Sequence, residues 1–140
     1  MKARDYLEQA FTLDQRINSK IQQVSSLNEL ATKCTSTITG MPRSSSHGRS
    51  KMADVIDKIV DLQEEINRDI DCLVDLKREI MKVIDLIEAP EYRTVLEMRY
   101  LCFTTWEQIA VDLGYSMHHV YKVHQLALKE AEKWIPNDTI

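Results

Sequence analysis

Apolar residues return every seven positions through residues 51–88, and this repeat constrains the fold more than any other feature of the chain. The first set is Met52, Ile59, Ile66, Leu73, Ile80 and Ile87. The second set, three residues further along, is Val55, Leu62, Leu76 and Val83. Asp69 interrupts the second set once, with Ile70 beside it. A repeat of this length predicts a left-handed coiled coil or a long helical hairpin, because such a helix cannot bury its seam alone.

A second amphipathic segment runs from Lys2 to about Ile38. Its apolar residues recur at helical spacing, at Tyr6, Ala10, Leu13, Ile17, Ile21, Val24, Leu27, Ala31 and Cys34. Residues 39–50 between the two segments are rich in Gly, Pro and Ser and contain no acidic residue, which predicts a flexible loop. The two helices are expected to pack antiparallel across this loop. A second copy of the chain is the other partner that the pattern leaves open.

Composition narrows the class of protein. Aromatic residues make up only 6% of the chain, which argues against an aromatic-rich β-sandwich, and the 3 glycines and 3 prolines leave long uninterrupted segments. The first residues carry charges throughout and resemble no secretory signal, and no apolar run approaches the roughly 18–20 residues of a membrane span. We therefore expect a cytoplasmic protein without membrane contact. Three scattered cysteines predict reduced, mostly buried thiols.

The net charge of −4 is unevenly distributed. Residues 1–50 carry 7 basic and 4 acidic side chains, residues 51–90 carry 6 and 11, and residues 91–140 carry 5 and 7. No part is strongly basic, so tight non-specific DNA binding by a monomer is not expected. The acidic residues of the heptad segment are interpreted as a solvated helix face. The sequence contains no Gly-rich phosphate loop, catalytic triad or metal-ligand spacing, and it predicts neither an enzyme nor a cofactor or metal site.

The C-terminal part contains several helix boundary signals in close succession. Pro90 suits the first turn of a helix, and Thr104 to Glu107 matches a capping box with Thr104 as the N-cap. A short helix is then expected from Thr105 to Leu113, with Trp106, Ile109, Ala110 and Leu113 facing inward. Gly114 follows as a left-handed C-cap, and Ser116 as the N-cap of the next helix. Two helices joined by a turn of about three residues with glycine predict a helix-turn-helix.

The last helix is predicted from Met117 to about Trp134, and its two faces differ in chemistry. The buried stripe is expected to consist of Val120, Val123, Ala127, Ala131 and Trp134. The outward face then holds Met117, His118, Tyr121, Lys122 and Gln125. No acidic residue occurs between Asp112 and Glu130, so the local field is mildly basic. His118, His119 and His124 are interpreted as surface or groove-contacting residues, because their spacing is poor for one metal ion.

The stretch VLEMRYLCFTTWEQIAVDLGYSMHHVYKVHQLALKEAEK resembles region four of bacterial sigma factors. The whole chain is similar to the ArpU-like transcriptional regulators, a family of small phage and prophage proteins from Gram-positive bacteria. Stretches similar to YLEQAFTLDQRIN, ATKCTSTITGMP and KIVDLQEEIN occur in that family's helical N-terminal half. The resemblance implies sequence-specific DNA binding and control of phage transcription. Its relatives tend to carry arginine-type residues where Met117 and His118 stand, so fewer guanine contacts are expected here.

These observations predict an all-α protein with two parts. Residues 1–88 form a long antiparallel helical hairpin with the flexible loop 39–50, and residues 89–140 form a helix-turn-helix domain like sigma region four. The helix of residues 117–134 enters the major groove of double-stranded DNA. The resemblance gives base-reading roles to Met117, His118, Tyr121 and Lys122, and Gln125 shares their face. It places Thr104, Thr105 and Ser116 near phosphates.

The expected partners are double-stranded DNA and a second copy of the chain, joined through the long helices. RNA polymerase is a further candidate, because region-four-like domains also dock on it. The alternative function is accordingly a non-enzymatic interaction module that binds RNA polymerase or a coiled-coil partner. The DNA target and the sign of regulation are not encoded in any motif of the sequence.

Overall fold

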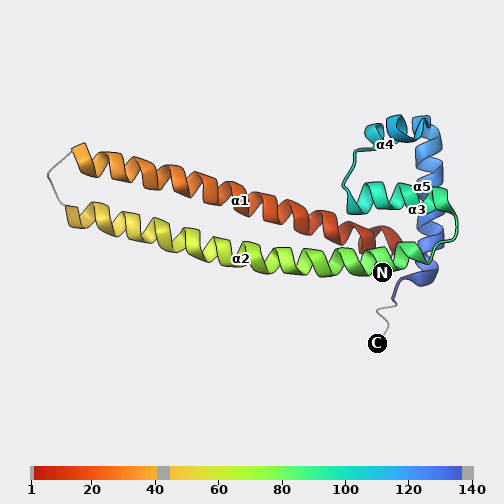
Figure 1. Ribbon diagram of the computed structural model, residues 1–140, viewed down its shortest axis with the longest axis horizontal. Helices are drawn as coiled ribbons and strands as arrows, with labels where there is room; N and C mark the ends of the chain where they lie inside the picture. Colours follow the sequence, from red (N-terminus) through yellow and green to blue (C-terminus); the bar gives the residue numbers. More distant parts are fainter. Residues whose placement is uncertain (1, 41–44, 137–140) are drawn as a thin grey trace. The chain divides into compact units, whose positions relative to one another are not determined.

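The computed structural model describes residues 2–40 and 45–136 of the chain, and in these ranges it is all-helical without a strand (Figure 1). The prediction of an all-α fold is thus confirmed. Two long helices are followed by short ones, and the elements are α1 (Ala3–Gly40), α2 (Ser45–Asp85), α3 (Pro90–Leu96), the π-helical turn η1 (Glu97–Leu101), α4 (Trp106–Leu113), α5 (Met117–Ala131) and the 3-10 turn η2 (Glu132–Trp134). No described helix is long and apolar enough to cross a membrane.

Both long helices extend into the segment that the sequence predicts as a loop. Thr39 and Gly40 belong to α1, and Ser45–Ser50 belong to α2. The predicted loop 39–50 is therefore too long, and only residues 41–44 of it lie outside the described residues. The reason is that each added residue of an existing helix gains one backbone hydrogen bond, which outweighs the modest helix penalties of Ser and of a single Gly.

The chain divides into two compact units, and α1 and α2 contribute to both. The paired-helix unit is Gln15–Cys72, and the core unit consists of Met1–Asp14 and Leu73–Ile140. These bounds differ from the division after residue 88 that the sequence suggests. The physical reason is that the start of α1 and the end of α2 share one hydrophobic core with α3 and α5.

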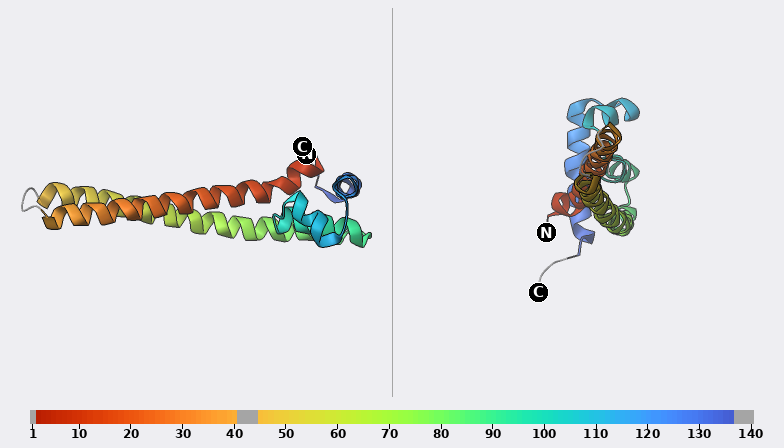
Figure 2. Two further views of the ribbon diagram at one scale, coloured as in Figure 1. Left: turned by 90° about the horizontal axis from the view of Figure 1, so that it is seen from above. Right: turned by 90° about the vertical axis from the view of Figure 1, so that its left-hand side faces the viewer.

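In the paired-helix unit, the α1 and α2 segments run antiparallel and lie side by side in both views (Figures 1 and 2). Ile17 and Ile66 are its buried apolar residues in the described ranges. The interruption of the heptad at Asp69 has a partner on α1, because the Lys20 ammonium lies 2.6 Å from the Asp69 carboxylate. Lys20 therefore occupies the seam where the sequence predicts Ile21, whose side chain is exposed.

The core unit gathers apolar side chains from both ends of the sequence. Its buried cluster consists of Ala3, Leu7 and Ala10 from α1, Ile80, Val83 and Ile84 from the end of α2, Ile87 from the connection after α2, and Leu96, Tyr100, Ala127, Ala131 and Ile135. A second, smaller cluster of Ile109, Ala110 and Val120 joins α4 to α5. Trp134, predicted in the buried stripe of the last helix, is instead exposed, because α5 ends at Ala131 and the next three residues form a 3-10 turn.

The connection between α3 and α4 has unusual backbone geometry. Cys102 N–H bonds to the Glu97 carbonyl at 3.0 Å, and Thr104 N–H bonds to the Met98 carbonyl at 2.9 Å. Phe103 has a φ of 57°, a left-handed value that costs a bulky residue on the order of 1 kcal/mol. Its ring compensates by packing 5.6 Å from the Phe11 ring, with the Lys77 ammonium 4.6 Å from its centroid. The break in the helical pattern predicted at CFTT is therefore a turn that is held by specific hydrogen bonds and ring contacts.

The cysteines differ from the expectation of mostly buried thiols. Cys72 and Cys102 are both exposed and unbridged. Cys72 lies on α2 outside the seam, and Cys102 follows the last residue of η1, so neither position faces a core. The side chain of Cys34 lies outside the described residues.

Candidate nucleic-acid interface

The turn between α4 and α5 is held by backbone hydrogen bonds that depend on Gly114. Gly114 has a φ of 69°, and its N–H bonds to the Val111 carbonyl while the next N–H, of Tyr115, bonds to the Ala110 carbonyl at 2.9 Å. This pair of bonds is a Schellman motif, which needs a left-handed residue at the position after the helix. The C-cap predicted at Gly114 is thus confirmed, and it sets the direction in which the chain enters α5.

The N-terminus of α4 is capped one residue later than the sequence analysis predicts. Thr105, not Thr104, is the N-cap, and its hydroxyl oxygen accepts a hydrogen bond from Gln108 N–H at 3.2 Å. The prediction failed because the two adjacent threonines each begin a matching pattern, one ending at Glu107 and the other at Gln108. The Gln108 side chain bonds forward to Asp112 at 2.7 Å, so α4 is braced along its exposed side.

Ser116 caps α5 as predicted. Its hydroxyl oxygen accepts from His119 N–H at 3.1 Å, and the first turn of the helix contains no acidic residue. The cap uses one of the free N–H groups of this terminus, and the partial positive charge of the helix end remains unopposed by any acid in that turn. The start of α5 is therefore a mildly electropositive end of a rigidly capped helix.

The structure separates the predicted outward residues into two groups. His118, Tyr121, Lys122 and Gln125 are exposed on α5. Met117 is only half-exposed, because it packs against the cluster of Ile109, Ala110 and Val120. Of the residues assigned to phosphates, Thr105 and Ser116 are exposed and Thr104 is half-buried. Four of the five outward residues are therefore accessible together on one helix.

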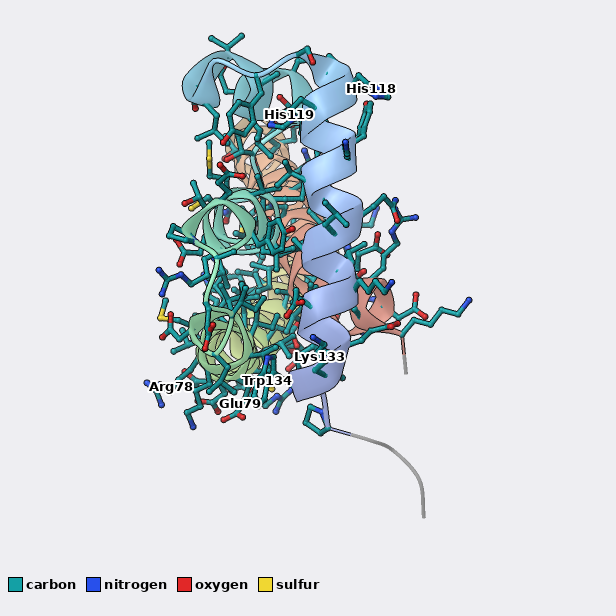
Figure 3. All side chains as sticks on the ribbon, turned by 90° about the vertical axis from the view of Figure 1, so that its right-hand side faces the viewer. Arg78, Glu79, His118, His119, Lys133 and Trp134 are labelled. Carbon is teal, nitrogen blue, oxygen red and sulfur yellow. The ribbon has the colours of Figure 1, made fainter. Side chains whose placement is uncertain are left out.

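The three histidines occupy different environments. His118 and His119 point to opposite sides of α5 (Figure 3), and the His119 ring packs edge-on against Tyr115 at 4.5 Å. His124 is 1% exposed, so its interpretation as a surface residue is wrong. His124 lies four residues after Val120 and three before Ala127, which places it on the buried face of the helix.

His124 joins η1 to α5 through a buried hydrogen bond. Its Nε2 lies 2.7 Å from the Tyr100 hydroxyl, and its ring packs edge-on against Trp106 at 4.5 Å. Burial is the main cause that lowers the pKa of His124 to about 4, and the nearby cations Arg4 and Arg99 act in the same direction. Burial also raises the pKa of Tyr100 to about 12. Both groups are therefore neutral at pH 7.

Trp106 of α4 packs against the accessible face of α5 at Tyr121. Its ring packs edge-on against Tyr121 at 5.6 Å, and the Arg99 guanidinium lies 4.4 Å from its centroid. Arg99 also donates a hydrogen bond to the Thr104 carbonyl at 3.1 Å. The π-helical turn thus places Arg99 where it holds both the strained connection and the Trp106 ring. Sequence analysis gave Arg99 no role, because this contact depends on the path of η1.

A basic groove lies beside the C-terminal half of α5 and was not predicted. It has a volume of about 490 Å³, and its lining includes Lys2 and Arg4 at the start of α1 and Gln125 and Lys129 on α5. Glu132 is the acidic residue in this lining. Gln125 belongs both to the groove and to the accessible face of α5. Sequence analysis missed the groove because residues 2–4 and 125–129 are brought together only by folding.

No group of three or more His, Cys, Asp or Glu side chains in the described ranges is placed to hold a metal ion. The residues of the site are instead hydrogen-bond donors, amides and cations on a capped helix. The fold and site thus define an all-helical protein with a polar, mildly basic accessible face on α5.

The chain belongs to the family described as protein of unknown function DUF1492, which matches residues 33–132 and is phage-associated. The match covers more than half of the chain and includes α4, α5 and the Gly114 turn. No curated protein and no solved structure shows significant similarity to it. The similarity to ArpU-like regulators remains a prediction.

Proposed function

We propose that this protein is a sequence-specific DNA-binding transcription regulator of phage or prophage genes. In this proposal α4 and α5 form a helix-turn-helix, and the N-terminal half of α5 enters the major groove of double-stranded DNA. The observation that carries it is the accessible face of His118, Tyr121, Lys122 and Gln125 on a helix that is capped at Ser116 and held by the Gly114 turn. The resemblance to sigma region four and the phage association of the family agree with it.

The side chains of this face suit base edges and phosphates. A glutamine amide such as that of Gln125 can pair with both N6 and N7 of adenine, and the Lys122 ammonium can bind guanine or a phosphate. Trp106 limits the freedom of Tyr121 through the edge-on contact at 5.6 Å, so less side-chain entropy is lost on binding. Because Met117 packs against the α4–α5 cluster, we assign it a positioning role and only a minor role in reading bases.

The first experiment replaces Tyr121 and Lys122 together by alanine. We expect affinity for the phage DNA upstream of the protein's own gene to fall at least about 30-fold, because each of the two lost base or phosphate contacts costs about 1–3 kcal/mol. Fluorescence anisotropy over a salt series measures it, with Lys58→Ala in the paired-helix unit as a control. If the unmodified protein showed no sequence preference at any salt concentration, the proposed function would be wrong.

The basic groove should contribute phosphate contacts that carry no sequence information. Lys2→Gln with Lys129→Gln is expected to weaken binding to specific and unrelated DNA alike, and to reduce the slope of log K against log salt by about 2. Both substitutions leave the buried clusters untouched, and Arg4 is retained because it neighbours Tyr100. Lys51→Gln with Lys58→Gln removes the same charge elsewhere. If the two double variants had the same slope of log K against log salt, the groove would not be part of the DNA interface.

The alternative function is a non-enzymatic module that docks on RNA polymerase or on a coiled-coil partner. Its supporting observation is that the outer side of α5 also exposes Leu126, an apolar residue directly after Gln125. The two functions are separable by activity. A Tyr121→Ala and Lys122→Ala variant that keeps its regulatory activity would favour protein docking, especially if Leu73→Asp abolished that activity without unfolding the chain.

A further inference from the structure

The paired-helix unit exposes one face that contains no charged residue in the described ranges, although its helices are highly charged. The two sides of the α1–α2 seam are formed by the residues that directly follow and the residues that directly precede the seam residues. The following residues form what we call the uncharged face. It consists of Asn18, Ile21, Ser25, Asn28 and Thr32 on α1 and Ala53, Ile56, Val60, Gln63, Asn67 and Ile70 on α2. All of them are exposed.

The residues that directly precede the seam residues form the opposite face, and its chemistry is different. On α2 all of these are charged, namely Lys51, Asp54, Lys58, Asp61, Glu65 and Arg68. Several of them line one open groove with Ser19, Gln23 and Ser26 of α1. This groove shows that the preceding residues of both helices share one side of the pair, as antiparallel helices require. The following residues therefore share the other side.

The paired-helix unit buries little apolar surface by itself. Ile17 and Ile66 are its buried apolar residues in the described ranges, whereas Ile21, Ile56, Val60 and Ile70 are 41–49% exposed. Ile56 and Ile70 directly follow the seam residues Val55 and Asp69 of α2. Ile21 directly follows Lys20, which pairs with Asp69 in the seam, so the three isoleucines flank the seam as one row. Two helices that leave such a row open gain burial when a second layer of helices covers it.

We propose that the uncharged face binds the same face of a second copy of the chain, forming a two-fold symmetric four-helix bundle. The 51–72 segment has 3 basic and 7 acidic residues, so two copies would repel each other in most orientations. The uncharged face is the side on which two such units approach without opposing charges. Its Asn, Gln, Ser and Thr side chains can both donate and accept hydrogen bonds, so the face is complementary to itself.

The size of the face suits a reversible dimer. It extends over about 17 residues of helix, roughly 26 Å, and is about 20 Å wide across two helices, which gives on the order of 500 Å² per chain. The two copies together would bury about 1,000 Å², at the lower limit for a specific interface. DNA is a poor occupant of the uncharged face, because the face has no Lys or Arg side chain that could bind phosphates. The inference does not depend on the proposed DNA binding.

The test is light scattering coupled to size-exclusion chromatography over a concentration series of the full chain. The unmodified protein is expected to change from monomer to dimer with rising concentration. Ile56→Glu with Ile70→Glu places four carboxylates in the contact, so the dissociation constant should rise at least about 100-fold. Leu30→Glu is the matched control, because Leu30 is as exposed as Ile56, at 47%, but precedes its seam residue.

Dimers of the unmodified chain and of the Leu30 variant, with monomers of the double variant, support the inference. A monomer at all concentrations overturns it, as does a dimer that the double variant keeps or that the Leu30 variant loses equally. Circular dichroism verifies helicity, and the milder pair Ile56→Gln and Ile70→Gln replaces the glutamates if they unfold the unit. DNA binding by a monomer would leave the proposed function standing and this inference rejected.

Discussion

Lowering the pH from 7 towards 4 is expected to reduce the free energy of unfolding of the core unit by about 3 kcal/mol through His124 alone. The folded-state pKa of His124 is lowered from 6.5 to about 4. Each pKa unit of difference between folded and unfolded chain corresponds to about 1.4 kcal/mol. The contribution of His124 to stability is therefore complete above pH 6.5. It is lost as the pH falls towards 4, because the unfolded chain gains the proton first.

The surroundings of His124 explain why the proton is excluded. The side chain is almost fully buried, and Arg4 and Arg99 add positive charge nearby. The Tyr100 hydroxyl lies 2.7 Å from Nε2 of His124, and while both groups are neutral it can donate its proton to that nitrogen. Only a neutral imidazole can accept this bond, so protonation would break it and place a charge among cations.

Urea unfolding at a series of pH values between 7 and 4.5 measures this effect. His124→Gln removes the titrating group and should make the pH dependence shallower than that of the unmodified protein. His118→Gln, at an exposed histidine of the same helix, should leave the pH dependence unchanged. Both variants retain the carboxylates that also titrate in acid. Identical pH profiles for the two variants would contradict the assignment, as would an NMR titration of His124 near its ordinary pKa.

The features that sequence analysis located correctly are those determined by local chemistry. Gly114 and Ser116 were recognisable because a left-handed C-cap and an N-cap need particular residue types within one turn of helix. The heptad repeat likewise indicates a helix without knowledge of its partner. Thr105 was missed as the N-cap of α4 for a local reason as well, since the neighbouring Thr104 satisfies the same capping pattern.

The features that sequence analysis missed depend on residues far apart in the chain. His124 was assigned to the surface although it falls on the Val120–Ala127 stripe, because a polar residue there needs a buried partner. That partner, Tyr100, lies 24 residues away. In the sequence, Asp69 interrupts the apolar heptad without an evident reason, because its partner Lys20 is 49 residues distant. Neither separation has a periodic signature, so no pattern of spacing could pair these residues.

The core unit likewise joins residues far apart in the chain, Met1–Asp14 with Leu73–Ile140, and this leads to the second large expected effect. A chain of residues 89–140 alone should not fold cooperatively. Of the 12 residues in the large buried cluster, 7 lie outside that range, in α1, at the end of α2 and directly after α2. Without them, Leu96, Tyr100 and Ala127 would face water, and the five short helical segments α3, η1, α4, α5 and η2 cannot compensate by local propensity. Far-UV circular dichroism during heating should show no sigmoidal transition.

A complementary deletion separates the loss of this core from a general effect of truncation. Replacing residues 15–72 by about six Gly and Ser residues keeps both parts of the core unit, since packed helices lie only about 8–10 Å apart. This shortened chain should unfold cooperatively. Leu7→Ala in the full chain should cost the core unit about 2–5 kcal/mol, because Leu7 is fully buried there. If residues 89–140 folded alone and Leu7→Ala cost nothing, the ends of the long helices would be dispensable, and the proposed DNA-binding face of α5 would need only α3–α5 for support.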